Sequence, residues 1–298
     1  MADQKATDRQ NSYVLAFLTV GFLWGLNWPA VKFILTEVPP ITMRAVSFSS
    51  AAIILALVVM RSKQTFRLQR DEIIPTAIVG AFLIFGFNVL TAFGQMIVET
   101  SKATIIAYTM PSITAVLAAF YLKERIKLQT ILALVIAMMG LAIMVSEDMT
   151  QLIQNPIGPI IMFVAALSWS IGNVGLKAVE WRLQPLPLTV WFFVFSSLIA
   201  WPLVFIYEPL GAQNLPSLKV LAMLAYHVLG PMVICYLLWA YLVSQLPTTI
   251  ASISILIAPV VGVLSSILFL DNDVTWRIMT ALTTILISIT LVLTLKNK

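Results

Sequence analysis

TSKATIIAYTMPSITAVLAAFYL, residues 100–122, has a second copy in the chain, TTIASISILIAPVVGVLSSILFL, at residues 248–270. A shift of 148 residues superposes a threonine, an alanine, a proline and a leucine of one copy on the same residue types in the other. A second pair of stretches, WGLNWPAVK at 24–32 and WSIGNVGLK at 169–177, has its tryptophan and lysine in register at a shift of 145 residues. We therefore predict two related halves, residues 1–150 and 151–298.

The composition predicts that lipid surrounds most of the chain. Of its 298 residues, 60% are hydrophobic and only 10% are charged, with a mean hydropathy of +0.97, whereas a soluble domain has about 25% charged residues. A bilayer core of about 30 Å needs roughly 20 apolar residues per helix. The apolar runs of that length cover residues 13–35, 39–60, 73–97, 101–122, 128–146, 157–179, 186–207, 219–243, 248–270 and 275–295. We predict an all-α integral membrane protein of ten transmembrane helices.

The charges between these runs predict the orientation of the halves. With the N-terminus in the cytoplasm, 13 of the lysines and arginines fall inside and five outside, which places both termini in the cytoplasm. Five helices per half is an odd number, so equivalent positions face opposite sides of the membrane. The basic turn KERIK at 123–127 and its acidic counterpart DNDVT at 271–275 agree with that inversion. Inverted repeats are typical of secondary transporters, whose substrate site lies near the midplane between the halves.

These motifs resemble the EamA branch of the drug/metabolite transporter superfamily, over nearly the whole chain. The matching residues are Trp24, Gly25, Asn27, Trp28 and Lys32, then Pro40 and Arg44, Pro111, Glu124 and Arg125, Ser168, Trp169 and Asn173, Tyr236 and Trp239, and Pro259. One departure is Asn272-Asp273, which replaces the second copy of the Glu-Arg turn. The resemblance implies a ten-helix exporter of small metabolites. The WGLNW start most resembles members that export amino acids and their derivatives.

Polar and aromatic side chains within the apolar runs are the candidate substrate-binding residues. Helical spacing puts Trp24 and Trp28 on one face with Asn27 beside them, and the second half repeats this pattern with Trp169 and Asn173. An asparagine facing lipid would leave its amide unpaired at a cost of a few kcal/mol. We therefore expect both asparagines to face the bundle interior, where they line a cavity or, alternatively, bond a neighbouring helix.

Further candidates lie in four other predicted helices. They are Arg44, Asn88 and Gln95 (with Thr91 on the same stripe), Tyr108, Tyr236 and Trp239. Arg44 is a candidate anion-binding group because a guanidinium can hold a carboxylate at two points. Its alternative role is anchoring at the outer membrane interface, and the aromatic residues can equally be packing residues.

Proton coupling and gating have few candidates. No Asp or Glu falls near a predicted midplane, so His227 and the edge-placed Glu99 are the coupling candidates. A hydrogen-bonded structural role is the alternative for His227, and without titration of either group we expect facilitated or exchange transport. Pro111 and Pro259 remove backbone hydrogen bonds and are candidate hinges, or else fixed kinks.

The predicted function is export of small amphipathic metabolites, amino acids or their derivatives, by alternating access. The alternatives are an exporter of drugs or cationic compounds, and a channel or non-transporting receptor. An enzyme is disfavoured because one histidine, one cysteine and no midplane acid supply no catalytic set. We expect a bacterial inner-membrane protein, a monomer or homodimer, with lipid and a small-molecule substrate as partners and no metal, cofactor or nucleic acid.

Overall fold

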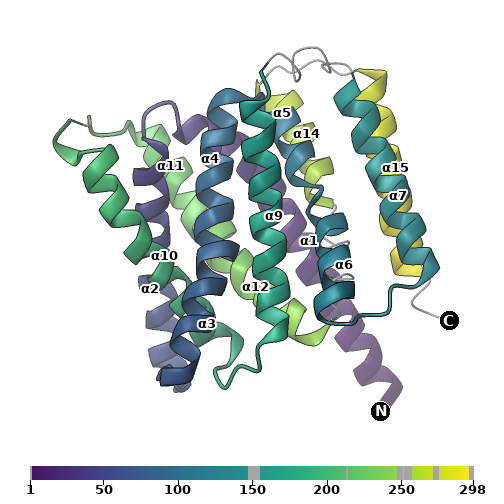
Figure 1. Cartoon of the computed structure of the whole chain (residues 1–298), viewed down its shortest axis with the longest axis horizontal. Helices are drawn as coiled ribbons and strands as arrows, with labels where there is room; N and C mark the ends of the chain where they lie inside the picture. Colours follow the sequence, from purple (N-terminus) through teal and green to yellow (C-terminus); the bar gives the residue numbers. More distant parts are fainter. Residues whose placement is uncertain are drawn as a thin grey trace.

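The computed structural model describes residues 2–146, 155–212, 214–246, 251, 257–270 and 275–294, and the regular structure in these ranges is helical (Figure 1). The α-helices are α1 (Ala2–Ile34), α2 (Pro40–Ser62), α3 (Arg70–Gly80), α4 (Phe87–Ile97), α5 (Thr100–Ala107), α6 (Met110–Tyr121), α7 (Leu128–Val145), α9 (Ile157–Ala178), α10 (Pro185–Tyr207), α11 (Leu218–His227), α12 (Tyr236–Gln245), α14 (Ile257–Leu270) and α15 (Trp276–Thr294). Two π-helical segments, η1 (Ala81–Gly86) and η4 (Val228–Cys235), join α3 to α4 and α11 to α12, and η3 (Leu210–Ala212) is a 3₁₀ turn.

Six helical stretches are long and apolar enough to cross a membrane. They are Tyr13–Ile34, Pro40–Ser62, Arg70–Ile97, Ile157–Ala178, Pro185–Tyr207 and Leu218–Gln245, of 22 to 28 residues each. Four shorter apolar helices are Met110–Tyr121, Ile131–Gly140, Ile257–Phe269 and Trp276–Ser288. Large apolar side chains on the outside of the bundle, such as Leu57, Ile78 and Phe205, are exposed. In a membrane, that surface contacts lipid.

Helices from the first and second parts of the chain pack against each other in pairs. Helix α2 lies along α10, α7 along α15, and α1 along α14, while α9 packs against η1, α4, α5 and α6. Figure 1 shows these helices running roughly side by side from the top to the bottom of the view, with the start of α1 and the end of α15 toward the same end of the bundle.

Glycines allow the closest of these contacts. A Cβ atom added to Gly172 of α9 would lie 2.6 Å from the Cα of Leu83 in η1, and one added to Gly25 of α1 would lie 2.5 Å from the Cβ of Val261 in α14. Small residues at such crossings let helix backbones approach within van der Waals contact, the main source of association energy in lipid.

The stretch at 101–122, predicted as one helix, is two. Helix α5 ends at Ala107 and α6 begins at Met110, with Pro111 in its first turn. Proline has no backbone N–H and its ring clashes with the preceding turn, which explains the break. Pro259 is buried within α14. Whether either proline acts as a hinge stays a prediction. The predicted acidic turn at Asn272-Asp273 lies outside the described residues.

Candidate functional site

A cavity lies inside the bundle, between helices that come from residues 24–110 and from residues 169–236. Its lining residues are Trp24, Asn27, Trp28, Val31, Arg44, Phe87, Asn88, Thr91, Gln95, Tyr108, Met110, Trp169, Met232 and Tyr236. Nine of the eleven candidate substrate-binding residues are in this set. The cavity has a volume of about 40 Å³. One water needs at least ~10 to 15 Å³ of such space, so the cavity holds about three or four waters at most.

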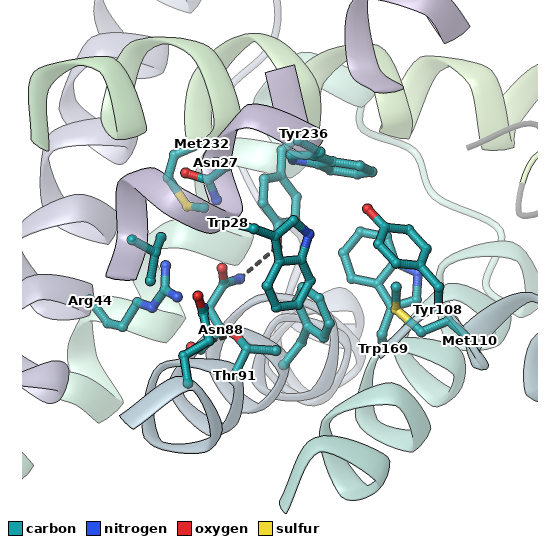
Figure 2. A pocket seen from close by; sticks show the side chains of 14 residues that line it. Asn27, Trp28, Arg44, Asn88, Thr91, Tyr108, Met110, Trp169, Met232 and Tyr236 are labelled. Atoms are coloured by element: carbon teal, nitrogen blue, oxygen red, sulfur yellow. Dashed lines mark hydrogen bonds between the residues drawn. The ribbon is translucent and has the colours of Figure 1, made fainter. Parts of the chain in front are cut away.

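The cavity has a polar and an apolar end (Figure 2). Figure 2 shows the guanidinium of Arg44 at one side, pointing toward the middle of the group, while Tyr108, Met110 and Trp169 lie at the other side. Trp28 stands between them, and its ring centroid is 6.2 Å from that of Tyr108. This gradient of polarity fits a solute that is charged at one end and apolar at the other.

Arg44 lies at one end of a buried polar chain that runs through His227 to Asn27. Its side chain is 1% exposed, and its Nη1 atom lies 3.0 Å from Nε2 of His227. His227 is fully buried, with its Nδ1 atom 2.7 Å from Oδ1 of Asn27. A guanidinium can only donate hydrogen bonds, so Nε2 accepts from Arg44 and the ring proton sits on Nδ1, where it is donated to Asn27. The alternative in which Arg44 anchors to lipid headgroups is wrong, because the side chain is enclosed by the bundle.

Three polar atoms at this cavity have no hydrogen-bond partner within the described part of the chain. They are Nε of Arg44, Oε1 of Gln95 and Nε1 of Trp169, all buried. Within the same described part of the chain, no carboxylate forms an ion pair with Arg44. Buried polar groups in folded proteins are nearly always paired, and unpaired ones call for a ligand or water. The cavity therefore offers a charged donor, a neutral donor and a neutral acceptor.

Three aromatic rings line one side of the cavity, and a fourth, that of Trp239, packs behind them. The ring centroid of Trp24 lies 5.2 Å from that of Trp169, 5.7 Å from that of Tyr236 and 5.8 Å from that of Trp239. Behind them, Nε1 of Trp239 donates to Oδ1 of Asn173 at 2.6 Å, and Nδ2 of Asn173 donates to the Trp169 carbonyl at 2.9 Å. Asn173 and Trp239, the two remaining candidates, thus lie outside the cavity wall and bond each other.

Asn88 and Tyr236 form a hydrogen bond between α4 and α12 beside the cavity. The amide of Asn88 donates to the hydroxyl of Tyr236 at 2.6 Å, the dashed line in Figure 2, and to the Ile84 carbonyl at 2.8 Å. Both side chains are buried and line the cavity. This bond ties α4 to α12, so any opening between those helices has to break it.

The coupling candidates differ in position. His227 contacts Arg44 and Asn27, both of which line the cavity. Glu99 is exposed in the turn between α4 and α5 and does not line it. Proton coupling through either residue stays a prediction.

The sequence did not reveal the apolar part of the lining. Val31, Phe87, Met110 and Met232 line the cavity, but apolar side chains fill every membrane-spanning run and carry no signal of their own there. Thr91 could be predicted as a lining residue, because it lies on the same helix face as Asn88 and Gln95.

Comparison with known proteins identifies the family. The sequence profile of the EamA-like transporter family matches residues 11–146 and 156–294. The chain belongs to this family. It is therefore a multi-pass membrane transporter of the EamA type.

Similar family members are known from several bacteria. One is the uncharacterized transporter YoaV of Bacillus subtilis, 23% identical over 266 residues, 89% of this chain and 91% of that protein. Another is a probable amino-acid metabolite efflux pump of Escherichia coli, 26% identical over 277 residues, 88% of each chain. A solved crystal structure has the same fold, with a TM-score of 0.78 at 16% identity over 96% of this chain and 98% of that one.

Proposed function

We propose that this EamA-type transporter exports small amphipathic metabolites, with amino acids or their derivatives as the substrate class, by alternating access. The observation that carries the proposal is the small cavity with a buried arginine at one end and aromatic rings at the other. The E. coli relative, named a probable amino-acid metabolite efflux pump, supports the substrate class. Since the cavity is too small for an amino acid, the helices around it must separate to admit one.

The proposed architecture is ten spans arranged as two inverted five-helix halves, residues 1–150 and 151–298. It is supported by contacts between residues that the internal repeat makes equivalent. Asn88 bonds Tyr236 at the 148-residue shift, while the ring pairs Trp24–Trp169 and Phe48–Phe193 follow the 145-residue shift. A twofold axis brings equivalent residues together only where they lie beside it. These contacts thus favour an axis through the cavity.

A matched pair of lysine contacts supports the same arrangement. Lys32 at the end of α1 donates to the Gln95 carbonyl at 2.5 Å, and Lys177 at the end of α9 donates to the Val243 carbonyl at 3.2 Å. Both the lysines and the acceptors are equivalent under the repeat. Each lysine compensates the unpaired carbonyls at the C-terminal end of a helix.

The two ends of the bundle differ, as alternating access requires. Near the start of α2, the Glu208 carboxylate accepts from the backbone N–H groups of Ile41 and Thr42. At the opposite end, a larger cavity of about 570 Å³ lies beside Lys177 and Gln184. With cytoplasmic termini in a bacterial inner membrane, the end near Glu208 is the outer end, where these bonds join α2 to the end of α10, and the larger cavity lies at the cytoplasmic end.

The alternatives fit the cavity less well. Within the described ranges, no Asp or Glu lines it, so a purely cationic compound would meet Arg44 without a counter-charge. A channel needs a continuous wet path, which a space of about 40 Å³ does not supply.

Counterflow in proteoliposomes tests the transport proposal. We expect saturable uptake of labelled phenylalanine or leucine, stimulated by the same amino acid inside the vesicles. Absence of stimulated uptake for all common amino acids would remove them as the substrate class. Stimulated uptake of a cationic dye in their place would favour the multidrug alternative.

Thiol labelling tests the architecture. Cys235 is the only cysteine and is buried, so single cysteines placed at Glu124 and Asn272 report their own side of the membrane. We expect an impermeant maleimide to label them from opposite sides in intact cells and inverted vesicles. Labelling from one side would exclude the inverted repeat.

A further inference from the structure

We propose that Arg44 is the carboxylate-binding residue of this cavity and that His227 positions it, so that the transported solute is recognised as an amphipathic carboxylate. This inference rests on the proposed transport function and narrows its substrate class. Under this proposal a carboxylate on the solute is required for binding, whereas an ammonium group on the solute is accommodated but not required.

The charge at Arg44 is the first argument. A buried guanidinium costs free energy unless it is paired, and the hydrogen-bonding partner that the structure supplies is a neutral imidazole. In the described ranges no acidic side chain compensates it, and its Nε atom is left without a partner. A carboxylate provides both the missing negative charge and two oxygen acceptors, which match the planar edge of a guanidinium.

The position of His227 is the second argument. It is fully buried at the end of α11, is not among the residues that line the cavity, and its Nε2 atom accepts from Nη1 of Arg44. Asn27 holds the other ring nitrogen and thereby fixes the ring orientation. The groups that face this histidine are thus a cation and an amide. The geometry gives it the role of a hydrogen-bond acceptor that aims the guanidinium into the cavity.

The remaining lining defines the rest of the solute. Oε1 of Gln95 is a buried acceptor without a partner and suits an ammonium or amide N–H of the solute. Tyr108, Met110 and Trp169 lie at the opposite side from Arg44 and suit an aromatic or branched apolar group. Amino acids with large apolar side chains have both features, and so do aryl-substituted carboxylic acids that lack an ammonium group.

A matched pair of probes tests the role of the carboxylate. In 3-phenylpropanoate and 3-phenylpropanamide the apolar part is the same and only the carboxylate is replaced by a neutral amide. Binding to the purified full-length protein is measured from the shift in its thermal unfolding temperature at increasing probe concentration. We expect the carboxylate to bind at least about thirtyfold more tightly than the amide, as for a buried charge pair. Equal affinity of the two probes for the unaltered protein would overturn the proposal.

Variants then assign the preference to residues. Arg44→Gln should abolish the preference by weakening carboxylate binding while leaving amide binding unchanged. His227→Gln retains an acceptor for Arg44 and should keep most of the preference, whereas His227→Leu should lose a large part of it. Arg182→Gln is the control, because it removes an arginine whose side chain is 62% exposed. It should change neither affinity.

The outcomes separate this inference from the transport proposal. If Arg44→Gln binds the carboxylate as tightly as the unaltered protein, Arg44 is not the binding residue. If Arg44→Gln does not fold, Arg44→Lys, which keeps the charge but not the two-point edge, should lower the preference, and an unchanged preference there would also refute the proposal. Carboxylate-selective binding without counterflow would refute transport of these solutes and leave the site intact.

Discussion

Replacing Glu208 with alanine should destabilise the protein by about 2 kcal/mol, because its carboxylate caps another helix. Helix α2 begins with Pro40 after Pro39, and it has no side-chain cap of its own. Neither proline has a backbone N–H, so the first donors at this end belong to Ile41 and Thr42. Glu208, which follows α10, accepts from these two N–H groups at 3.0 and 2.7 Å and from the Thr42 hydroxyl at 2.9 Å.

The magnitude follows from the burial of the donors. Removing a helix cap costs about 1 kcal/mol, and a buried donor left unpaired costs roughly 1 to 3 kcal/mol. Ile41 and Thr42 are each 6% exposed, so water replaces the carboxylate only in part. We therefore expect a loss of about 2 kcal/mol for Glu208→Ala, equivalent to a fall of roughly 4 to 8 °C in Tm. Glu208→Gln keeps one acceptor oxygen and should lose about half as much.

The single cysteine supplies the assay. Cys235 is buried and should react with a maleimide dye only as the protein unfolds, so dye fluorescence against temperature gives the Tm in detergent. Glu180→Ala is the matched control, since Glu180 is exposed and makes no side-chain hydrogen bond within the described ranges. A Tm for Glu208→Ala within about 1 °C of that control would refute the capping argument.

Three smaller predictions use the same assay. Gly172→Ala should lower the stability by about 1 to 3 kcal/mol by overpacking. Gly230→Ala is its control and should be nearly neutral, because the added methyl group would lie 3.4 Å from its nearest neighbour. Equal losses of stability in the two variants would contradict the close contact at Gly172. Trp239→Phe removes the donor to Asn173 and should cost roughly 1 to 3 kcal/mol, and an unchanged Tm would show the bond to be dispensable. Asp71→Asn breaks an ion pair with a 63% exposed side chain, so it should cost less than about 1 kcal/mol and less still in high salt.

Much of the helical architecture was predictable because a helix that crosses a bilayer needs a run of roughly 20 apolar residues, which is visible in the sequence. Each of the six long helices coincides with an apolar run of the length a bilayer needs. The break between α5 and α6 was less predictable, since Pro111 is compatible with a kink or with a new helix. The π-helical segment η1 contains no proline that would mark it in the sequence, whereas η4 contains Pro231, which cannot donate a backbone hydrogen bond and so indicates an irregular helix.

The polar part of the cavity was predictable for a related reason. A residue such as Asn27 or Asn88 is costly in lipid, so its presence in an apolar run points inward. The partner it finds is a tertiary result: Arg44 and His227 are 183 residues apart, and nothing local pairs them. Asn173 shows the limit of the reasoning. It does face inward, but it bonds Trp239 behind the cavity wall.

The tightness of the central cavity has a consequence for the cell that houses this protein. A space of about 40 Å³ lined by three indole rings has room for only a few waters. A file of waters that could relay protons would therefore be interrupted at this point for as long as the cavity keeps this size. A cell could then keep idle copies of such a transporter in its membrane without draining the ion gradients across it.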